Sequence, residues 1–495
     1  MLTIKPYEFW FVTGSQHLYG EDALQEVAAN SQAVVDGLNK EGDLPFPIVF
    51  KSVLTTAEDI RQLALKANAD ENCAGLITWM HTFSPAKMWI AGLGSLQKPL
   101  LHLHTQYNRD IPWSDIDMDF MNLNQAAHGD REYGFIGTRM NIPRKVVVGH
   151  WQNSEVTGRV GNWMKTAVAY TEGPNVRVAR FGDNMRNVAV TDGDKVEAQI
   201  KFGWTVDYYG IGDLVEEMDK VTDQQLEDLF NEYQELYEIP EEAKQPGPVR
   251  DSILEQGRIE LGLKSFLSER NYNAFTTNFE DLHGMKQLPG LAAQRLMAEG
   301  YGFAGEGDWR TAALLRVMKI IAGNEGTSFM EDYTYHLEPG NEKVLGSHML
   351  EICPTVSATK PKIVVSPLGI GGKEDPARLV FDGKGGDAVN ASLVELGGRY
   401  RLVINEVKAE QPTIETPKLP VAKVLWKPQP SLSEATESWI YAGGAHHTVF
   451  SLDVTTEQLY DFADMVEVEC VVIDQDTNVR QFRNELKWNE AIWRR

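Results

Sequence analysis

The stretch that organises the chain is residues 305–351, GEGDWRTAALLRVMKIIAGNEGTSFMEDYTYHLEPGNEKVLGSHMLE. Its segment 309–321 is apolar on nearly every side, which predicts a buried helix. Asp308 stands at the N-cap position of that helix, and Gly323 ends it. Glu306 therefore falls in a loop bracketed by glycines and directed at a helix N-terminus, where negatively charged groups are favoured.

Two strands are expected to follow the helix, joined by a turn at Pro339-Gly340. Side chains alternate between the two faces of each strand over residues 329–335 and 344–350. With Pro339 and Gly340 at the centre of the turn, Glu331 is expected to face His348 across the hairpin. Pro-Gly is typical of a type II turn rather than of the tight hairpin turns, so a shifted register is the alternative.

Carboxylates and imidazoles recur around this hairpin. A lone Glu–His pair such as Glu331 and His348 is more often a surface ion pair or a core histidine than a ligand set. However, Glu306 lies just upstream, and the loop GGAHH (443–447) supplies two further imidazoles. Two carboxylates with two of these three imidazoles, and no thiolate, suit a divalent ion such as Mn²⁺, Co²⁺ or Mg²⁺. The spacing matches no HExxH motif, so ion pairing and metal binding both stay open.

The composition of the 495 residues narrows the class of protein. The 47 Lys and Arg against 71 Asp and Glu give a net charge of −24, which disfavours nucleic acid and anionic membranes as partners. Three scattered cysteines indicate a reducing compartment rather than a disulfide framework. The N-terminus has no export-signal pattern, and no stretch approaches the ~18 apolar residues of a membrane span. We expect a soluble, cytoplasmic protein of about two to four domains.

Strand and helix alternate through the first hundred residues, which predicts a parallel, doubly wound sheet. Ligands gather at the carboxyl ends of such strands, where two polar loops are expected, GSQHLYG (14–20) and HTFS (81–84). Neither loop is a dinucleotide or P-loop fingerprint, so nucleotide binding is disfavoured. The expected strands cover 8–13, 47–51, 75–80 and 100–103, and the expected helices 22–38, 56–67 and 84–96.

A turn-rich break at residues 171–175 is expected to separate a second strand–helix alternation, which begins with a strand at 176–181. The acidic segment 216–238 is interpreted as a helix with a solvated face. A strand at 273–277 leads into NFEDLHG (278–284), which is either a site loop or a hydrogen-bonded turn.

From residue 329 onward the pattern becomes β-rich, and it closes with a helix from Thr455 and a strand at 468–473. We therefore expect an α/β protein: two doubly wound α/β domains, 1–174 and 175–326, followed by a β-rich antiparallel C-terminal domain, 327–495.

Long, ordered strings carry a resemblance to a known family from the first strand to the C-terminus. They are GSQHLYG, HTFSPAKMWI, MDFMNLNQAAHGDRE, RFGDNMR, NFEDLHG, GEGDW, SFMEDYTYH, GSHMLE, LGIGGKEDPAR and GGAHHTVF. With them the chain resembles the L-arabinose isomerases. The resemblance implies a fucose-isomerase-like fold and a Mn²⁺-dependent interconversion of L-arabinose and L-ribulose in arabinose catabolism, with Co²⁺ as a substitute ion. It also implies a hexamer made of two trimers.

The same resemblance implies a set of site residues. The metal ligands fall at Glu306, Glu331, His348 and His447, and the two glutamates also act as the acid/base pair. His446 is the adjacent imidazole, and we expect it either to bind the substrate or to support the ligands from behind. The sugar pocket, completed by a neighbouring subunit mainly through its N-terminal domain, is implied to be lined by Gln16, Leu18, Tyr19, His128, Met185, Phe279, Tyr333 and Ile370. Without the resemblance, core packing is the better interpretation of Met185, Phe279 and Ile370.

The chemistry of aldose–ketose isomerisation fits these residue types. A divalent ion over O1 and O2 of the sugar polarises the carbonyl and stabilises an enediolate. Two carboxylates can then take a proton from one carbon and return it to the next. Three other classes compete: a glycosidase, which needs two carboxylates but no histidines, a metal-assisted hydrolase or aldolase, and a non-enzymatic sugar-binding protein.

Overall fold

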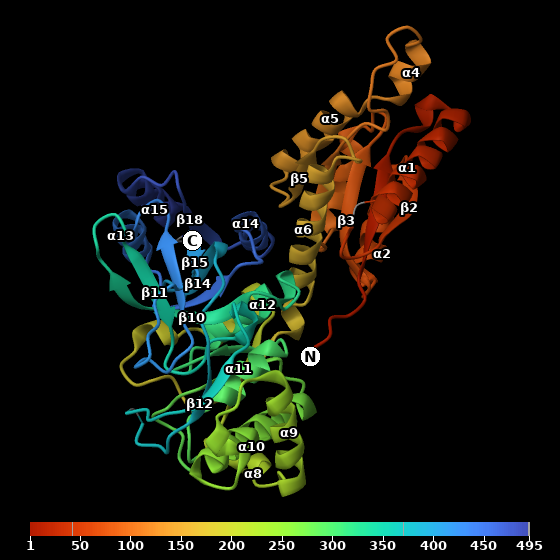
Figure 1. Cartoon of the computed structure of the whole chain (residues 1–495). Helices are drawn as coiled ribbons and strands as arrows, with labels where there is room; N and C mark the ends of the chain where they lie inside the picture. Colours follow the sequence, from red (N-terminus) through yellow and green to blue (C-terminus); the bar gives the residue numbers. More distant parts are fainter. Residues whose placement is uncertain (42, 370, 494–495) are drawn as a thin grey trace. The chain divides into compact units, whose positions relative to one another are not determined.

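The computed structural model describes residues 1–41, 43–369 and 371–493 and divides into two compact units, which Figure 1 traces along the chain. The smaller unit comprises Ile4–Thr171 and Asp464–Val466. The larger unit comprises Met1–Thr3, Glu172–Ala463 and Glu467–Arg495. Among the helices of the described residues, none combines the length and apolar character needed to cross a lipid bilayer.

The smaller unit is built on a five-stranded parallel sheet in the order β2-β1-β3-β4-β5. This is the strand order of a doubly wound sheet, so the alternation predicted for the first hundred residues is confirmed. Its strands are β1 (Glu8–Gly14), β2 (Ile48–Leu54), β3 (Cys73–Met80), β4 (Leu100–His104) and β5 (Lys145–Val148). Its helices are α1 (Glu21–Glu41), α2 (Ala57–Ala69), α3 (Ile90–Ser95), α4 (Met118–Leu123), α5 (Ala126–Arg139) and α6 (Ser154–Thr171).

One predicted helix of this unit, 84–96, is wrong in detail. The chain instead forms a 3₁₀ turn at Ala86–Trp89 and then the short helix α3. Gly92 and Gly94 lower the helix propensity of this segment. Gly92 is also required for packing, because a Cβ there would lie 2.4 Å from the side chain of Ile60.

The two polar loops of the smaller unit meet at the carboxyl ends of β1 and β3. Ser15 Oγ lies 2.7 Å from Thr82 Oγ1. A Cβ on Gly14 would approach the Ser84 side chain to 2.9 Å, so glycine permits this close contact. These loops therefore occupy the position where ligands bind in doubly wound sheets.

The larger unit begins with a four-stranded parallel sheet in the order β7-β6-β8-β9. This second strand–helix alternation was also predicted. The strands are β6 (Arg177–Phe181), β7 (Thr205–Tyr209), β8 (Ala274–Thr277) and β9 (Gly302–Ala304). The helices are α7 (Lys195–Phe202), α8 (Ile211–Met218), α9 (Asp223–Leu236), α10 (Pro248–Glu269), α11 (Gly290–Ala298) and α12 (Trp309–Ile321).

The acidic segment 216–238 is two helices rather than the one predicted. Thr222 interrupts it by forming a capping box with Gln225, so that α9 starts afresh at Asp223. Acidic residues do cover α9, but its Phe230 and Tyr233 are buried in the core.

The C-terminal part of the larger unit is β-rich, as predicted. Six antiparallel strands pair in a closed ring, β14-β17-β10-β11-β16-β15, because β15 also pairs with β14 along its length. β18 joins the edge of β15 in parallel, so the sheet is mixed. The strands are β10 (Thr327–His336), β11 (Lys343–Ser347), β12 (Lys362–Val365), β13 (Ala377–Val380), β14 (Gly386–Glu395), β15 (Tyr400–Glu410), β16 (Val424–Pro428), β17 (His447–Ser451) and β18 (Glu469–Ile473). The helices are α13 (Leu432–Ala442), α14 (Thr456–Met465) and α15 (Val479–Trp493), of which only α14 was predicted.

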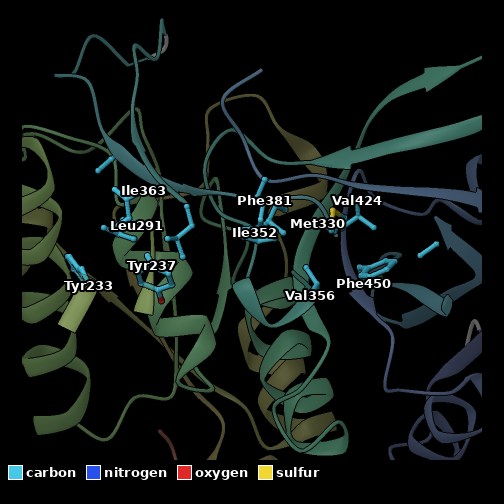
Figure 2. Close-up of a cluster of buried hydrophobic side chains, with 14 of the residues drawn as sticks. Tyr233, Tyr237, Leu291, Met330, Ile352, Val356, Ile363, Phe381, Val424 and Phe450 are labelled. Carbon is cyan, nitrogen blue, oxygen red and sulfur yellow. The ribbon is translucent and has the colours of Figure 1, made fainter. Parts of the chain in front are cut away.

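The inner face of the strand ring is packed with apolar side chains. Met330, Val424, Trp426 and Phe450 belong to one buried cluster, which Figure 2 shows extending to Tyr233 beside the helices of the central sheet. Trp426 fills the ring so closely that a Cβ on Gly346 would lie 1.9 Å from its indole. The wall of the ring therefore has a packed inner face. The residues that alternate with the inward-pointing ones along each strand point outward.

Candidate active site

Glu306 lies in the short loop between β9 and α12. Its backbone is left-handed, with φ of 62°, and Gly307 follows with φ of 79°. A Cβ on Gly305 would approach the His348 ring to 3.0 Å, and one on Gly307 would lie 2.6 Å from the Asp183 carbonyl. The two glycines thus let the loop enter a crowded site, and the strained backbone of Glu306 sets the direction of its carboxylate.

The Glu306 carboxylate meets two imidazoles from the start of β17. Its Oε2 is 3.6 Å from His446 Nε2 and 3.8 Å from His447 Nε2. Ligand atoms of these three side chains lie within 4.8 Å of one another. The His446 imidazole and, more weakly, those of His447 and His348 hold the pKa of Glu306 below its usual range, although burial opposes this. The Glu306 carboxylate in turn raises the pKa of His446.

Two polar atoms of this group are buried without a hydrogen-bond partner among the described residues. They are Glu306 Oε2 and His447 Nε2, which face each other across 3.8 Å. An acceptor and an imidazole nitrogen left in this way cost free energy unless a further group binds both. The pair therefore has unused capacity for a ligand.

His447 is fully buried and is held from its other ring nitrogen. Its Nδ1 donates to Asp308 Oδ2 at 3.0 Å. Asp308 also caps α12 by accepting from the backbone N–H and the hydroxyl of Thr311. Burial would raise the pKa of Asp308, but the hydrogen bond from His447 keeps it below the usual range. The first turn of α12 thus orients Nε2 of His447 toward Glu306.

His348 has the same kind of arrangement with a different carboxylate. Its Nδ1 lies 2.6 Å from Glu351 Oε2, and both side chains are buried. Burial alone would lower the pKa of His348, but the Glu351 carboxylate raises it. The Phe329 ring packs edge-on against both His348 and His447, with centroid distances of 4.9 and 5.0 Å. Phe329 therefore fixes the two imidazoles relative to each other.

The predicted pairing of Glu331 with His348 is wrong, because Glu331 lies opposite Ser347. The turn at Pro339-Gly340 and the register beside it are as predicted, with His336 opposite Lys343. A β-bulge between Asp332 and Thr334 then inserts Tyr333 into β10 without a partner on β11, which shifts the remaining pairs by one residue.

The bulge therefore gives Glu331 different neighbours. It pairs with Ser347 on β11 and with His447 on β17. The side chain is half-buried on the same strand face as His447. His348 follows β11 rather than belonging to it.

Glu306, His446 and His447 are the described residues whose ligand atoms lie close enough together to share one divalent ion. Ligand atoms about 2.1 Å from a shared ion lie about 3 to 4 Å apart, which is the spacing of Glu306 Oε2 from the two Nε2 atoms. Carboxylate oxygen and imidazole nitrogen without thiolate suit Mn²⁺, Co²⁺ or Mg²⁺ better than softer ions. The carboxylates that hold Nδ1 of His447 and His348 are those usually found behind metal-binding histidines.

Comparison with known proteins agrees over the whole chain. Three family models match in order: the L-arabinose isomerase N-terminal domain at residues 3–175, the central domain at 177–324 and the C-terminal domain at 326–469. The L-arabinose isomerase of Geobacillus stearothermophilus is 68% identical over 494 residues, which is 100% of both chains. Those of Halalkalibacterium halodurans and Clostridium beijerinckii are 67% and 64% identical over 100% of this chain and 99% and 100% of theirs.

The chain belongs to the L-arabinose isomerase family. It is therefore an enzyme of the isomerase class, and the glycosidase, hydrolase and sugar-binding interpretations are set aside.

The pocket residues that resemblance to this family implies are divided between the two units. In the larger unit, Met185 donates its backbone N–H to the Glu306 carbonyl at 3.0 Å, and its side chain is half-buried. Phe279 is half-buried after β8, and Tyr333 is 54% exposed at the bulge. Ile370 lies outside the described residues.

The other implied pocket residues belong to the smaller unit, three of them just after β1 and His128 in the first turn of α5. Leu18 is 83% exposed, and Tyr19 donates its hydroxyl to Gln125 Oε1 at 3.0 Å. Gln16 precedes them and is half-buried. His128 is exposed and stacks on Phe83 with a centroid distance of 5.4 Å.

The segment NFEDLHG is a hydrogen-bonded turn. Asp281 accepts from Asn278 and from the backbone N–H of Asp183. Arg186 forms ion pairs with both Glu280 and Asp281. These carboxylates fasten the loop after β6 and hence the backbone of Met185.

The residues that support the site were not predicted from the sequence. Asp308 was interpreted only as a helix cap, and Glu351 and Phe329 were assigned no role. Glu351 stands three residues after His348, a separation that can be noticed in sequence. The contact between Asp308 and His447 joins residues 139 positions apart, and no local pattern indicates it.

Proposed function

We propose that the chain interconverts L-arabinose and L-ribulose with one divalent ion, Mn²⁺ or in its place Co²⁺. The names of its relatives support the substrate, since each is an L-arabinose isomerase over the full length of the match. The observation that carries the metal is the pair of buried, unpartnered atoms, Glu306 Oε2 and His447 Nε2, 3.8 Å apart.

Glu306, Glu331, His348 and His447 would hold the ion. A bound divalent ion would supply Lewis-acid polarisation of the sugar carbonyl and offset negative charge that develops on the sugar oxygens. His446 is 39% exposed and lies 3.6 Å from Glu306 Oε2, so we assign it to a sugar hydroxyl. Its position within the tightest three-residue group makes it the alternative fourth ligand.

The two carboxylates are proposed to move the proton between C1 and C2 of the sugar. Glu306 is oriented by its backbone and its two imidazole neighbours, and Glu331 is held on the strand next to His447. Together they can remove a proton from one carbon and return it to the other, a contribution of roughly 10²–10⁴-fold. The neutral sugar needs no cluster of basic residues to bind a phosphate.

We further propose that the enzyme is a cytoplasmic hexamer of two trimers in which a neighbouring chain completes each site. Leu18, which follows β1, and His128, in the first turn of α5, are both exposed, which is consistent with contacts outside their own unit. Mixing an inactive Gln16→Ala or His128→Ala protein with Glu306→Gln should restore partial activity in mixed oligomers. No recovery in verified mixed oligomers would show that each site is built within one chain.

The reaction itself is tested by incubating purified protein with Mn²⁺ and a panel of aldoses. We expect ketose from L-arabinose, loss of activity in EDTA and recovery with Mn²⁺ or Co²⁺. Activity that is unchanged in EDTA, or confined to other aldoses, would contradict the proposal. Running the reaction in D₂O should place deuterium on C1 of the ketose. The proton route would be excluded by no deuterium uptake together with near-normal turnover of Glu306→Gln and Glu331→Gln at saturating Mn²⁺.

A further inference from the structure

A second cavity lies at one end of the strand ring, on the opposite side of its wall from the Glu306 cluster. It has a volume of about 200 Å³, room for about six waters. A molecule the size of a five-carbon sugar therefore fits. The cavity is lined by Asp332, Tyr335, Asn390, Asn405, Pro428, Ala435, Thr436, Trp439, Ile440, Gly444, Ala445 and His446.

Because successive side chains of a strand point to opposite faces, this cavity and the Glu306 cluster lie on opposite sides of the ring wall. Glu331 and His447 are paired and point outward, whereas their neighbours Asp332 and Thr448 point inward. Thr448 Oγ1 accordingly contacts Asn390 Oδ1 of β14 at 3.3 Å inside the ring. His446, at the strand end, belongs to both places, since it lies beside Glu306 and also lines the cavity.

The polar groups of the cavity wall have hydrogen-bonding capacity that the described part of the chain leaves unfilled. Asp332 is its one carboxylate, and Asp332 Oδ1 is buried without a partner. The Asn405 amide nitrogen lies within hydrogen-bonding distance of three carbonyls, which engage its two N–H groups and leave its Oδ1 as an acceptor. Asn390 accepts from Thr448, which leaves its amide N–H groups as donors.

The aromatic part of the wall is held rigidly. Trp439 of α13 donates its indole N–H to the Ala445 carbonyl at 3.0 Å. A Cβ on Gly444 would come within 2.4 Å of that indole, so the loop can pack directly against the ring only with glycine there. A carboxylate, two amides and aromatic faces around one small cavity offer both hydrogen bonds and an apolar face to the same molecule.

We propose that this cavity is a second binding site for a neutral polyol or cyclic sugar. Hydroxyl groups of such a ligand would donate to Asp332 and Asn405 and accept from Asn390, and its C–H face would lie against Trp439. An anion is disfavoured by Asp332 and by Glu331 behind it. A bare cation such as Ca²⁺ would lack the several oxygen ligands it needs, because the cavity has a single carboxylate.

The site is tested on the metal-free full chain with ribitol, a five-carbon polyol that an isomerase does not convert. Binding is followed by saturation-transfer NMR and calorimetry. Thr436→Phe should fill the cavity from α13 and weaken ribitol binding at least tenfold. The matched control Glu437→Phe adds the same ring to an exposed position on the same helix and should leave binding unchanged.

A second variant removes the carboxylate without changing the volume. Asp332→Asn should weaken ribitol binding while the circular dichroism spectrum stays that of the parent, which keeps the test independent of whether Thr436→Phe folds. Ribitol binding that is absent from the metal-free protein, or equal in the parent, Thr436→Phe and Asp332→Asn, would overturn the proposal. Binding of Ca²⁺ in place of ribitol would do the same. L-Arabinose conversion is assayed separately in the parent protein, so failure of the cavity site is distinguishable from failure of the proposed reaction.

Discussion

Two places in the described part of the chain join buried carboxylates to imidazoles, and they differ in what the remaining imidazole nitrogens face. In the smaller unit, Asp130 lies between His102 Nε2 at 2.8 Å and His104 Nδ1 at 2.7 Å, and it also accepts from the Met80 backbone. A single carboxylate thus accepts hydrogen bonds from two imidazoles, one at each oxygen.

In the larger unit each imidazole has a carboxylate of its own. Asp308 serves His447 and Glu351 serves His348, both at Nδ1. The Nε2 atom of His447 then faces a third carboxylate, Glu306, whose Oε2 has no hydrogen-bond partner among the described residues. Among the described residues, His102 Nδ1 and His447 Nε2 are both buried without a hydrogen-bond partner. They differ in what they face, because His447 Nε2 has a further carboxylate oxygen, Glu306 Oε2, 3.8 Å away, whereas the Asp130 carboxylate is already shared by two imidazoles.

The largest effect is expected for Glu306→Gln. This change removes a metal ligand and a proton carrier together, and activity should fall by roughly 10²–10⁴-fold or more even at saturating Mn²⁺. Initial rates with L-arabinose, with circular dichroism to show that the fold persists, check this. Near-parent activity at high Mn²⁺ would mean that Glu306 is replaceable.

His447→Ala should next lower the Mn²⁺ content of the purified protein, whereas His446→Ala should leave the ion bound and chiefly raise KM. The reason is that His447 is buried and held by Asp308, while His446 is 39% exposed. Elemental analysis of both variants checks this. Full metal occupancy in His447→Ala would refute the ligand assignment, and loss of the ion in His446→Ala would move that ligand position to His446.

Asp308→Asn tests the comparison between the two networks. Loss of the carboxylate behind a metal-binding histidine typically costs 10–100-fold in metal affinity, so Mn²⁺ should bind that much more weakly. The matched control is Asp130→Asn. It should reduce the free energy of unfolding by about 1–3 kcal/mol through its buried hydrogen bonds and leave Mn²⁺ affinity unchanged. Equal Mn²⁺ affinities for the two variants would show that Asp308 supports the metal site no more than Asp130 does.

A smaller effect is expected for Gly305→Ala. The backbone there is ordinary, but the new Cβ would lie 3.0 Å from His348 Cε1, so the imidazole must shift by a few tenths of an ångström. Mn²⁺ affinity should fall less than in Asp308→Asn, as measured by titration of the metal-free protein. An unchanged affinity would show that the position of His348 is not critical for the ion.

Local patterns were sufficient to predict much of the fold. The bounds of α12, its cap at Asp308 and the Pro339-Gly340 turn depend on neighbouring residues, and all three were predicted correctly. The bulge at Tyr333 was missed, because pairing counted from the turn assumes an uninterrupted ladder. The closure of the strand ring was missed too, since it depends on β15 pairing with both β14 and β16.

In the candidate site, too, features set by local sequence could be predicted, whereas contacts between distant segments could not. Glu306 and the histidines could be singled out because their residue types and short motifs are visible in the sequence. Their support by Asp308 and Phe329 is a consequence of packing between distant segments. No local pattern in the sequence indicates that Asp130 is hydrogen-bonded to both His102 and His104.

The central claim is that the imidazoles beside Glu306, and not those beside Asp130, bind the ion. Pulsed electron paramagnetic resonance of protein loaded with Mn²⁺ tests it most directly, because nitrogen couplings report imidazole ligands. We predict histidine nitrogen couplings that are reduced in His447→Ala and retained in His102→Ala. Couplings that persist unchanged in His447→Ala, or that disappear in His102→Ala, would contradict the account.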